Sequence, residues 1–148
     1  MLYQAIGSFV ITAGHVEWAM CRVIGWVHGA FPGDVPEKVA RLGWSSLIKT
    51  IDYLALTNAD ARIVSDLLRK HDIERLTGIR HNMVHGRVSV DRAPAFHAVR
   101  HYPTGRKAII VGNTDDVLRS VQEMRALAHA IELALPEDRQ RVRYPDED

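Results

Sequence analysis

Apolar residues in the first thirty positions recur at alternating spacings of four and three, which is the repeat of one face of an α-helix. The positions of this stripe are Ile6, Val10, Ala13, Glu17, Met20, Ile24 and Val27. A second row at spacings of seven widens the stripe: Phe9, Val16 and Val23. The pattern predicts a long helix over residues 2–29 that packs against more than one neighbour.

Two further helical stripes follow the first. Asp34 and Pro36 are typical of a helix start and open a predicted helix over residues 34–56. Its apolar positions are Ala40, Trp44, Leu47, Ile51 and Leu54. A third helix is predicted over residues 59–85, closed by Gly86. Polar residues that can cap its start are Thr57, Asn58 and Asp60.

The period changes from helical to alternating after residue 87. Val88 and Val90 alternate with polar residues, and two β-favouring runs, 96–102 and 107–111, are joined by a Pro-Thr-Gly turn sequence. We therefore predict a small β-hairpin over about residues 88–111. A last helix follows from residue 114, capped by Asn113 or Thr114. Its stripe is Val117, Val121, Met124, Ala128, Ile131 and Leu135.

Together these elements predict a mainly α fold, a bundle of four to five helices with a small β-hairpin inserted before the last long helix. The chain of 148 residues has the length of one domain, which we place at residues 1–135. Residues 136–148 are mostly charged residues and proline, and we expect a disordered tail there.

The composition limits which cross-links, metal sites and cellular compartment are expected. Cys21 is the single cysteine, so neither an internal disulfide nor a paired-cysteine zinc site is available, and a reducing cytoplasm is the expected compartment. The N-terminal sequence has no evident secretory signal. The most apolar stretch, residues 5–31, contains several groups that are costly in a membrane, so we expect no membrane span. These groups are His15, Glu17, Arg22 and His28.

Positive charge is concentrated in the middle of the chain. The net charge is only +1, which argues against a uniformly basic nucleic-acid binder. Residues 62–107, however, hold ten Lys and Arg against four Asp and Glu, and five of the eight histidines. This distribution is typical either of a local anion-attracting face or of an ordinary solvated surface.

A guanidinium occupies a position where the bundle requires an apolar residue. Ile73, Leu76, Arg80 and Met83 follow one another at spacings of three, four and three. A charge left alone in such a seam costs several kcal/mol, so Arg80 needs a partner. Glu17 is the ionisable residue of the first stripe, and we predict that it orients Arg80. The alternative is an interior ion pair that fixes the packing of the helices and has no chemistry.

His85 lies at the predicted end of the third helix, where the helix dipole favours an imidazolium and proton transfer near neutral pH. An arginine beside a titrating histidine suits phosphoryl chemistry, because one stabilises developing charge and the other moves protons. With 15 Arg and 8 His, chance alone gives about 0.8 pairs at this spacing. Arg92 and His97 also match, but a proline lies between them.

The segment Arg80-His81-Asn82-Met83-Val84-His85-Gly86 resembles the signature of HEPN domains (higher eukaryotes and prokaryotes nucleotide-binding), an Arg, a polar residue, three variable residues and a His. The order of helices, the acidic residue in the first helix and the insertion before the last helix are similar too. The resemblance implies a metal-independent endoribonuclease, often a toxin or phage-defence component, that acts on RNA as a homodimer. It also implies an antitoxin protein as a partner in some systems.

Carried over by position, the resemblance gives each residue of the signature a role. Arg80 stabilises the charge of the phosphorane, and His85 acts as general base or acid while the RNA 2′-OH attacks the adjacent phosphate. His81 fills the polar slot, where Asn is the common residue, and Asn82 and Glu17 support the site. Basic residues of the following segment are the candidates for RNA contact, with plain solvent exposure as the alternative: Arg87, Arg92, His97, Arg100 and His101.

Helix geometry and missing motifs limit the other interpretations. Arg80 and His85 differ by about 140° around a helix axis, so the arginine side chain wraps around, the last turn unwinds, or a second subunit completes the site. His81 and His85 have the spacing of two metal ligands, but no third ligand is evident, so we expect neither a metal nor a cofactor. Phosphate-loop and GxSxG sequences are absent. The rival function is a catalytically inactive helical dimer that binds a protein, nucleotide or RNA partner.

Overall fold

The computed structural model describes residues 2–29, 35–85, 87–92 and 95–135, and it confirms a mainly helical fold. In order, the helices are α1 (Leu2–Val27), α2 (Glu37–Ala40), α3 (Trp44–Leu54), α4 (Ala59–Lys70), α5 (Ile73–His85) and α6 (Thr114–Ala134). Three strands lie between α5 and α6: β1 (Arg87–Arg92), β2 (Ala95–His101) and β3 (Lys107–Asn113). The predicted tail, residues 136–148, lies outside the described residues.

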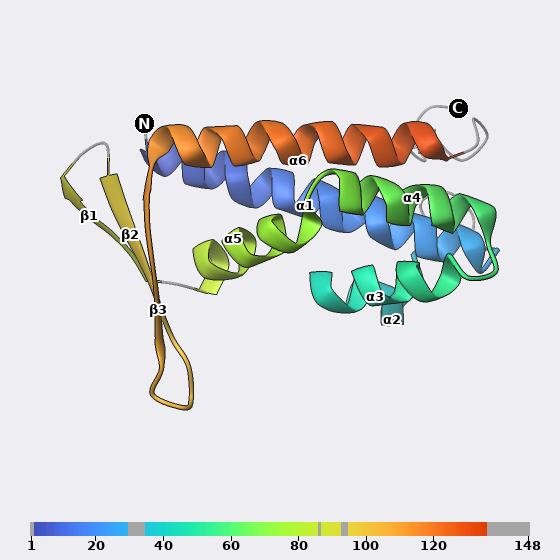
Figure 1. Ribbon diagram of the computed structural model, residues 1–148, viewed down its shortest axis with the longest axis horizontal. Coiled ribbons are helices and arrows are strands. Elements are labelled where there is room, and N and C mark those ends of the chain that lie inside the picture. The colour runs from blue at the N-terminus through green and yellow to red at the C-terminus, as the bar shows by residue number, and fades with distance from the viewer. Residues whose placement is uncertain (1, 30–34, 86, 93–94, 136–148) are drawn as a thin grey trace.

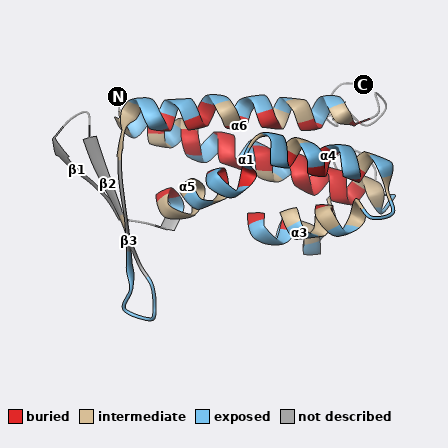
Figure 2. Cartoon of the chain, viewed as in Figure 1, coloured by how far each residue is buried: buried red, intermediate tan, exposed pale blue. Residues whose placement is uncertain are grey.

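The two long helices, α1 and α6, lie side by side and form the main packing contact of the bundle (Figure 1). Helices α3, α4 and α5 cover the other side of α1, and α4 also contacts α6. The sheet lies at one end of the bundle, beyond α5 (Figure 1). Buried residues line the facing sides of the helices (Figure 2), and the largest fully buried side chains include Phe9, Met20, Trp44, Leu76 and Met124.

The buried face of α1 is broader than the predicted stripe and is centred differently. Phe9, Val16 and Val23, the second row of the pattern, are all fully buried. Val10, assigned to the stripe, is 47% exposed. The reason is that α1 packs between α6 on one side and α3, α4 and α5 on the other. The middle of its buried face therefore lies along Phe9, Val16 and Val23.

Two predicted helices are each divided in the structure. The segment expected to be one helix over residues 34–56 contains α2 and α3, and Gly43, in an extended conformation, caps α3. The segment 59–85 is divided at residues 71–72, where Asp72 has a left-handed backbone with φ of 51°. An Asp tolerates this conformation, so the break has no Gly or Pro to signal it.

Asn58 caps α4 as predicted, accepting hydrogen bonds from the backbone N–H groups of Asp60 and Ala61.

The predicted hairpin is present as β2 and β3, and β1 extends it to an antiparallel sheet of three strands in the order β1-β2-β3. The turn between β2 and β3 is closed by the N–H of Gly105, which donates to the carbonyl of Tyr102 at 2.9 Å. Gly105 has φ of +77°, which glycine adopts without steric cost. At the end of β3, Asn113 and Asp116 form a capping box that starts α6.

None of the described helices combines the length and apolar character that crossing a bilayer requires.

Candidate functional site

The predicted contact between Glu17 and Arg80 is present in the structure. The Nη2 of Arg80, on α5, lies 2.8 Å from Oε2 of Glu17, on α1, and donates a hydrogen bond to it. The side chains are 20% and 29% exposed, respectively, so the pair lies at the edge of the core. A charge-assisted hydrogen bond across 63 residues of sequence therefore joins the first and fifth helices.

Trp44 provides the second contact of Arg80. The guanidinium carbon Cζ lies 5.5 Å from the centroid of the indole ring, within the range of a cation–π interaction. Trp44 is the first residue of α3 and is only 2% exposed. Three helices thus meet at one guanidinium. The sequence pattern places Trp44 in the core but contains no signal of its role as a partner of Arg80.

Two buried nitrogen atoms at this junction have no hydrogen-bond partner among the described residues: Nε of Arg80 and Nε1 of Trp44. Both are donors, because neither a guanidinium nor an indole can accept a hydrogen bond. Leaving a buried donor unsatisfied costs about 1–3 kcal/mol, and such groups are uncommon in folded proteins.

His85 is the last residue of α5, and its side chain lies outside the described part of the chain. The helix continues through this residue, so the last turn does not unwind between Arg80 and His85. The Cα atoms of Arg80 and His85 are consequently about 140° apart around the helix axis. The two side chains can therefore meet only if the arginine side chain wraps around the helix or if a second subunit completes the site.

The two residues after Arg80, His81 and Asn82, are half-buried on α5. Within the described ranges, no three His, Cys, Asp or Glu side chains gather as a metal site would require. The candidate RNA-binding residues lie on β1 and β2, and their side chains are outside the described part: Arg87, Arg92, His97, Arg100 and His101. The strand register pairs His97 with Ser89 and Val111, and His101 with Lys107.

Ion pairs neutralise much of the basic segment within the helices. Arg69 contacts Asp52 and Asp66, and Arg75 contacts Asp72 and Glu123. The excess positive charge of residues 62–107 therefore falls on the sheet segment rather than on α4 and α5. In the turn between β2 and β3 and at the start of β3, the side chains of Arg106 and Lys107 are both exposed.

A second ion pair involves a residue that the sequence pattern did not place in the core. Arg22, on α1, has a side chain only 4% exposed, and its Nη1 lies 3.5 Å from Oε1 of Glu132, on α6. The helical stripe of α1 does not include Arg22. Residues 19–25 of α1, which include Arg22, are all buried, so this part of the helix is enclosed on all sides. The apolar residues on either side of Arg22 are a signal of this enclosure in the sequence.

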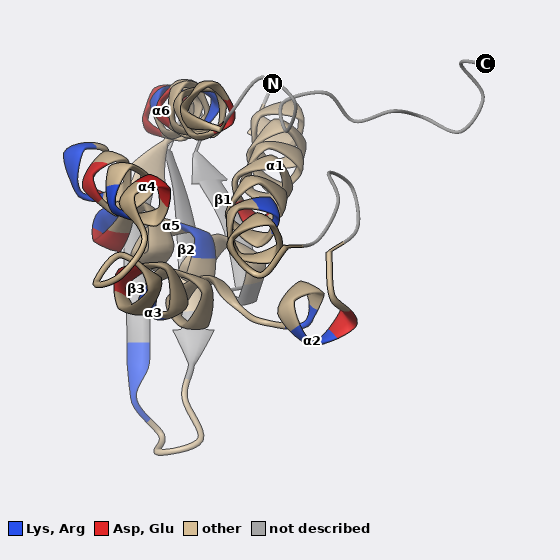
Figure 3. Cartoon of the chain, turned by 90° about the vertical axis from the view of Figure 1, so that its right-hand side faces the viewer, with Lys and Arg blue, Asp and Glu red and all other residues tan. Residues whose placement is uncertain are grey.

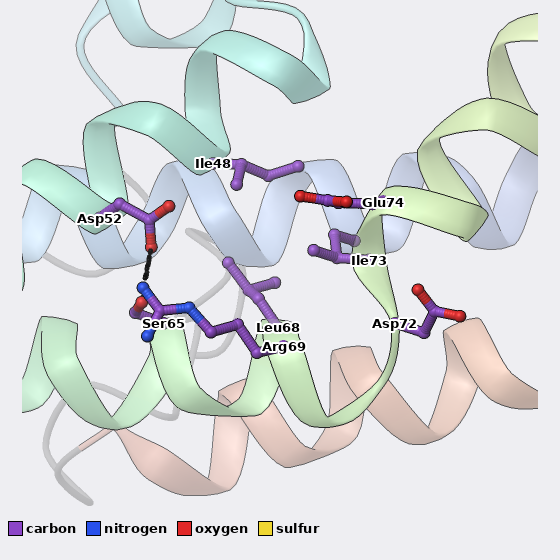
Figure 4. Close-up of a pocket in the computed structure, with 8 residues that line it drawn as sticks. All are labelled: Ile48, Asp52, Ser65, Leu68, Arg69, Asp72, Ile73 and Glu74. Atoms are coloured by element: carbon purple, nitrogen blue, oxygen red, sulfur yellow. Dashed lines mark hydrogen bonds and ion pairs between the residues drawn. The ribbon is translucent and has the colours of Figure 1, made fainter.

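A separate pocket of about 240 Å³ lies between α3, α4 and the start of α5 (Figure 4). Its polar residues are Asp52, Ser65, Arg69, Asp72 and Glu74. The hydroxyl of Ser65 donates to Oδ1 of Asp52 at 2.6 Å, and Arg69 contacts the same carboxylate (Figure 4). Three carboxylates against one guanidinium make this pocket unsuited to a phosphate.

The sequence matches no protein-family model, no curated protein and no solved structure.

We expect a double-mutant cycle to measure coupling between Glu17 and Arg80. Glu17→Gln and Arg80→Met each destabilise the protein, and the double variant loses less than the sum of the two. Because the pair is intermediate between exposed and fully buried pairs, the coupling free energy is about 1–2 kcal/mol. Urea unfolding of the four proteins measures it, and the same cycle on the exposed pair Glu37 and Arg41 is the control, with coupling below about 0.5 kcal/mol. Additive effects at Glu17 and Arg80 would contradict the expected coupling.

Stability is expected to fall between pH 9 and 11 because of Cys21. Burial, and secondarily the charge of Glu17, raises the pKa of this thiol from 9.0 to about 11. The unfolded chain releases the proton first, so the stabilisation is complete below pH 9 and is lost as the pH rises through 11. Relative to Cys21→Ala, the wild type loses about 2–3 kcal/mol over this range in urea unfolding. Parallel pH profiles of the two proteins would show that the thiol ionises equally well in the folded state.

Proposed function

We propose that this protein is a metal-independent endoribonuclease of the HEPN type, with Arg80 and His85 as its catalytic residues. The observation that supports this function best is the placement of Arg80. A permanently charged side chain is held in the seam of the bundle by Glu17 and Trp44, five residues before a histidine that ends the same helix. The acidic residue of α1 and the guanidinium of the signature are thus in contact, and His85 follows on the same helix.

In the proposed reaction, His85 acts as general base and takes the proton of the RNA 2′-OH. The 2′-oxygen then attacks the adjacent phosphorus, and the bond from phosphorus to the 5′-oxygen breaks. The leaving 5′-oxygen takes a proton from an imidazolium, which the second subunit's copy of the histidine supplies. Arg80 donates hydrogen bonds to the phosphorane oxygens as their negative charge grows. The products are a 2′,3′-cyclic phosphate and a 5′-hydroxyl.

The second candidate function is a catalytically inactive helical dimer that binds a protein, nucleotide or RNA partner. One observation favours it: the Arg80 charge is already compensated by Glu17 and Trp44, and the two charged side chains are 20% and 29% exposed. In that case the pair specifies how α1 and α5 pack, as buried ion pairs do in other proteins.

We propose a second copy of the chain as the partner, docked on α1. This helix exposes Tyr3, Val10, Ile11 and Trp18, which are 42–81% exposed. The space around Gly7 and Gly14, on the same face, is open, so another helix can approach closely. No Asp, Glu, Lys or Arg occurs before Glu17, and α1 is largely uncharged in Figure 3.

Two identical surfaces of this kind meet without like-charge repulsion, and exposed apolar side chains gathered on one helix face are typical of an interaction site. Glu17 borders the face, so docking through α1 brings the Arg80 sites of two copies towards each other. An antitoxin protein as a further partner, and action in the cytoplasm, stay predictions from the resemblance and the single cysteine.

We expect the wild-type protein to cleave RNA in excess EDTA and to leave 2′,3′-cyclic phosphate ends. Arg80→Ala and His85→Ala lower the rate by at least about a hundredfold, because each removes charge stabilisation or proton transfer. Arg125→Ala and His129→Ala, at exposed positions on α6, are matched controls and keep full activity. The readout is gel or mass analysis of cleaved RNA, with folding checked by circular dichroism. Equal activity of all five proteins would exclude this site, and loss of wild-type activity in EDTA would exclude a metal-independent reaction.

We expect Ile11→Glu to convert a dimer into a monomer, because it places two carboxylates within the uncharged α1 contact. Ile11 is 63% exposed, so the substitution does not disturb the core. Leu133→Glu on α6, at a residue 61% exposed, is the control and stays dimeric. Sedimentation equilibrium measures the mass of each protein. A wild-type protein that stays monomeric, or an Ile11→Glu dimer as tight as the wild type, would exclude the α1 contact.

A further inference from the structure

We propose that Trp44 is the positioning residue of Arg80: its indole face fixes the plane of the guanidinium, so that one edge of it meets the RNA phosphate. This inference rests on the proposed ribonuclease function for its catalytic consequence. The positioning itself is a property of three helices and is measured without RNA.

The contact with Glu17 alone does not orient Arg80. A single hydrogen bond from Nη2, of 2.8 Å, lets the guanidinium turn about that contact, and the arginine side chain has four rotatable bonds. The ring of Trp44 acts from a different helix and in a different direction, since a cation–π contact favours a position over the ring face. The two contacts together define both the place and the plane of the guanidinium.

Trp44 is itself held rigidly. It begins α3 directly after the cap residue Gly43, so its backbone is fixed by the helix. Its side chain is 2% exposed and belongs to the core cluster that also contains Leu47 and Leu76. A buried ring on a fixed backbone is a better reference surface for a long flexible side chain than an exposed ring.

The polar atoms at the junction are not explained by packing alone. Nε of Arg80 and Nε1 of Trp44 are both buried without an acceptor among the described residues. An apolar pair of similar shape would fill the same space without this cost. The arrangement is explained if the indole is needed for its π face and the guanidinium for its charge.

The placement assigns different tasks to the nitrogen atoms of Arg80. Nη2 is engaged by Glu17, and Nε is buried against the core. Nη1 is therefore the nitrogen that we assign to the phosphate oxygen. An arginine is suited to this division, because its fork presents five N–H groups in fixed directions.

The test compares Trp44→Phe, which keeps an aromatic face, with Trp44→Leu, which keeps apolar volume alone. Trp44→Met replaces the leucine variant if the latter does not fold. The first readout is the NMR cross-peak of the Arg80 Nε–H group, assigned by its loss in Arg80→Lys. We expect an upfield ring-current shift of this proton in the wild type and in Trp44→Phe, and its loss in Trp44→Leu. The proposal would be overturned if the Nε–H proton of Arg80 has no upfield ring-current shift in the wild type. It would also be overturned if the shift of this proton is the same in Trp44→Leu as in the wild type.

The second readout is RNA cleavage. Misplacing a catalytic group by a fraction of an ångström to an ångström lowers kcat by about ten- to a hundredfold, with a smaller effect on KM. We expect this split for Trp44→Leu and rescue to within about threefold by Trp44→Phe. Equal losses in the two variants would show a purely structural role and would overturn the proposal. If the NMR result is obtained but no protein cleaves RNA, the ribonuclease function fails while the positioning of Arg80 by Trp44 is supported.

Discussion

A guanidinium in an apolar seam has to be compensated, and this requirement organises the middle of the molecule. Arg80 lies on the same face of α5 as Leu76 and Met83, which are buried. Its charge is balanced by Glu17 of α1, and its Cζ lies over the indole ring of Trp44 of α3. Because removing either partner leaves a partly desolvated charge, arrangements of the three helices that separate these side chains are disfavoured. The same contacts hold the guanidinium of Arg80 between α1 and α3.

The rest of the bundle supports this junction from outside. The α1–α6 packing fixes the helix that carries Glu17, and the ion pair between the buried Arg22 and the exposed Glu132 adds a polar contact between those two helices. On the other side, ion pairs of Arg69 and Arg75 connect α3, α4, α5 and α6 around the pocket of Figure 4. These contacts neutralise positive charge on the helices, so the excess positive charge of residues 62–107 lies mainly in the sequence of the strands and of the turn between β2 and β3.

Sequence periodicity predicted the helical class, the hairpin and the contact between Glu17 and Arg80, because each depends on a pattern of polar and apolar positions. It missed what depends on three-dimensional packing. Trp44 was assigned to the core from its stripe, and nothing in that stripe shows which charge lies over its ring. The break at Asp72 was missed because an Asp, rather than a Gly, adopts the left-handed conformation. The pairing of β1 with β2 was missed because the alternation of Val88 and Val90 is too short to predict a third strand beside the hairpin.

The covalent path between helix and sheet is very short. One residue separates His85, which ends α5, from Arg87, which begins β1. Two peptide steps span at most about 7 Å, so the start of β1 cannot lie farther than that from the end of α5. A larger displacement of the start of β1 would therefore require the terminal turn of α5 to move with it.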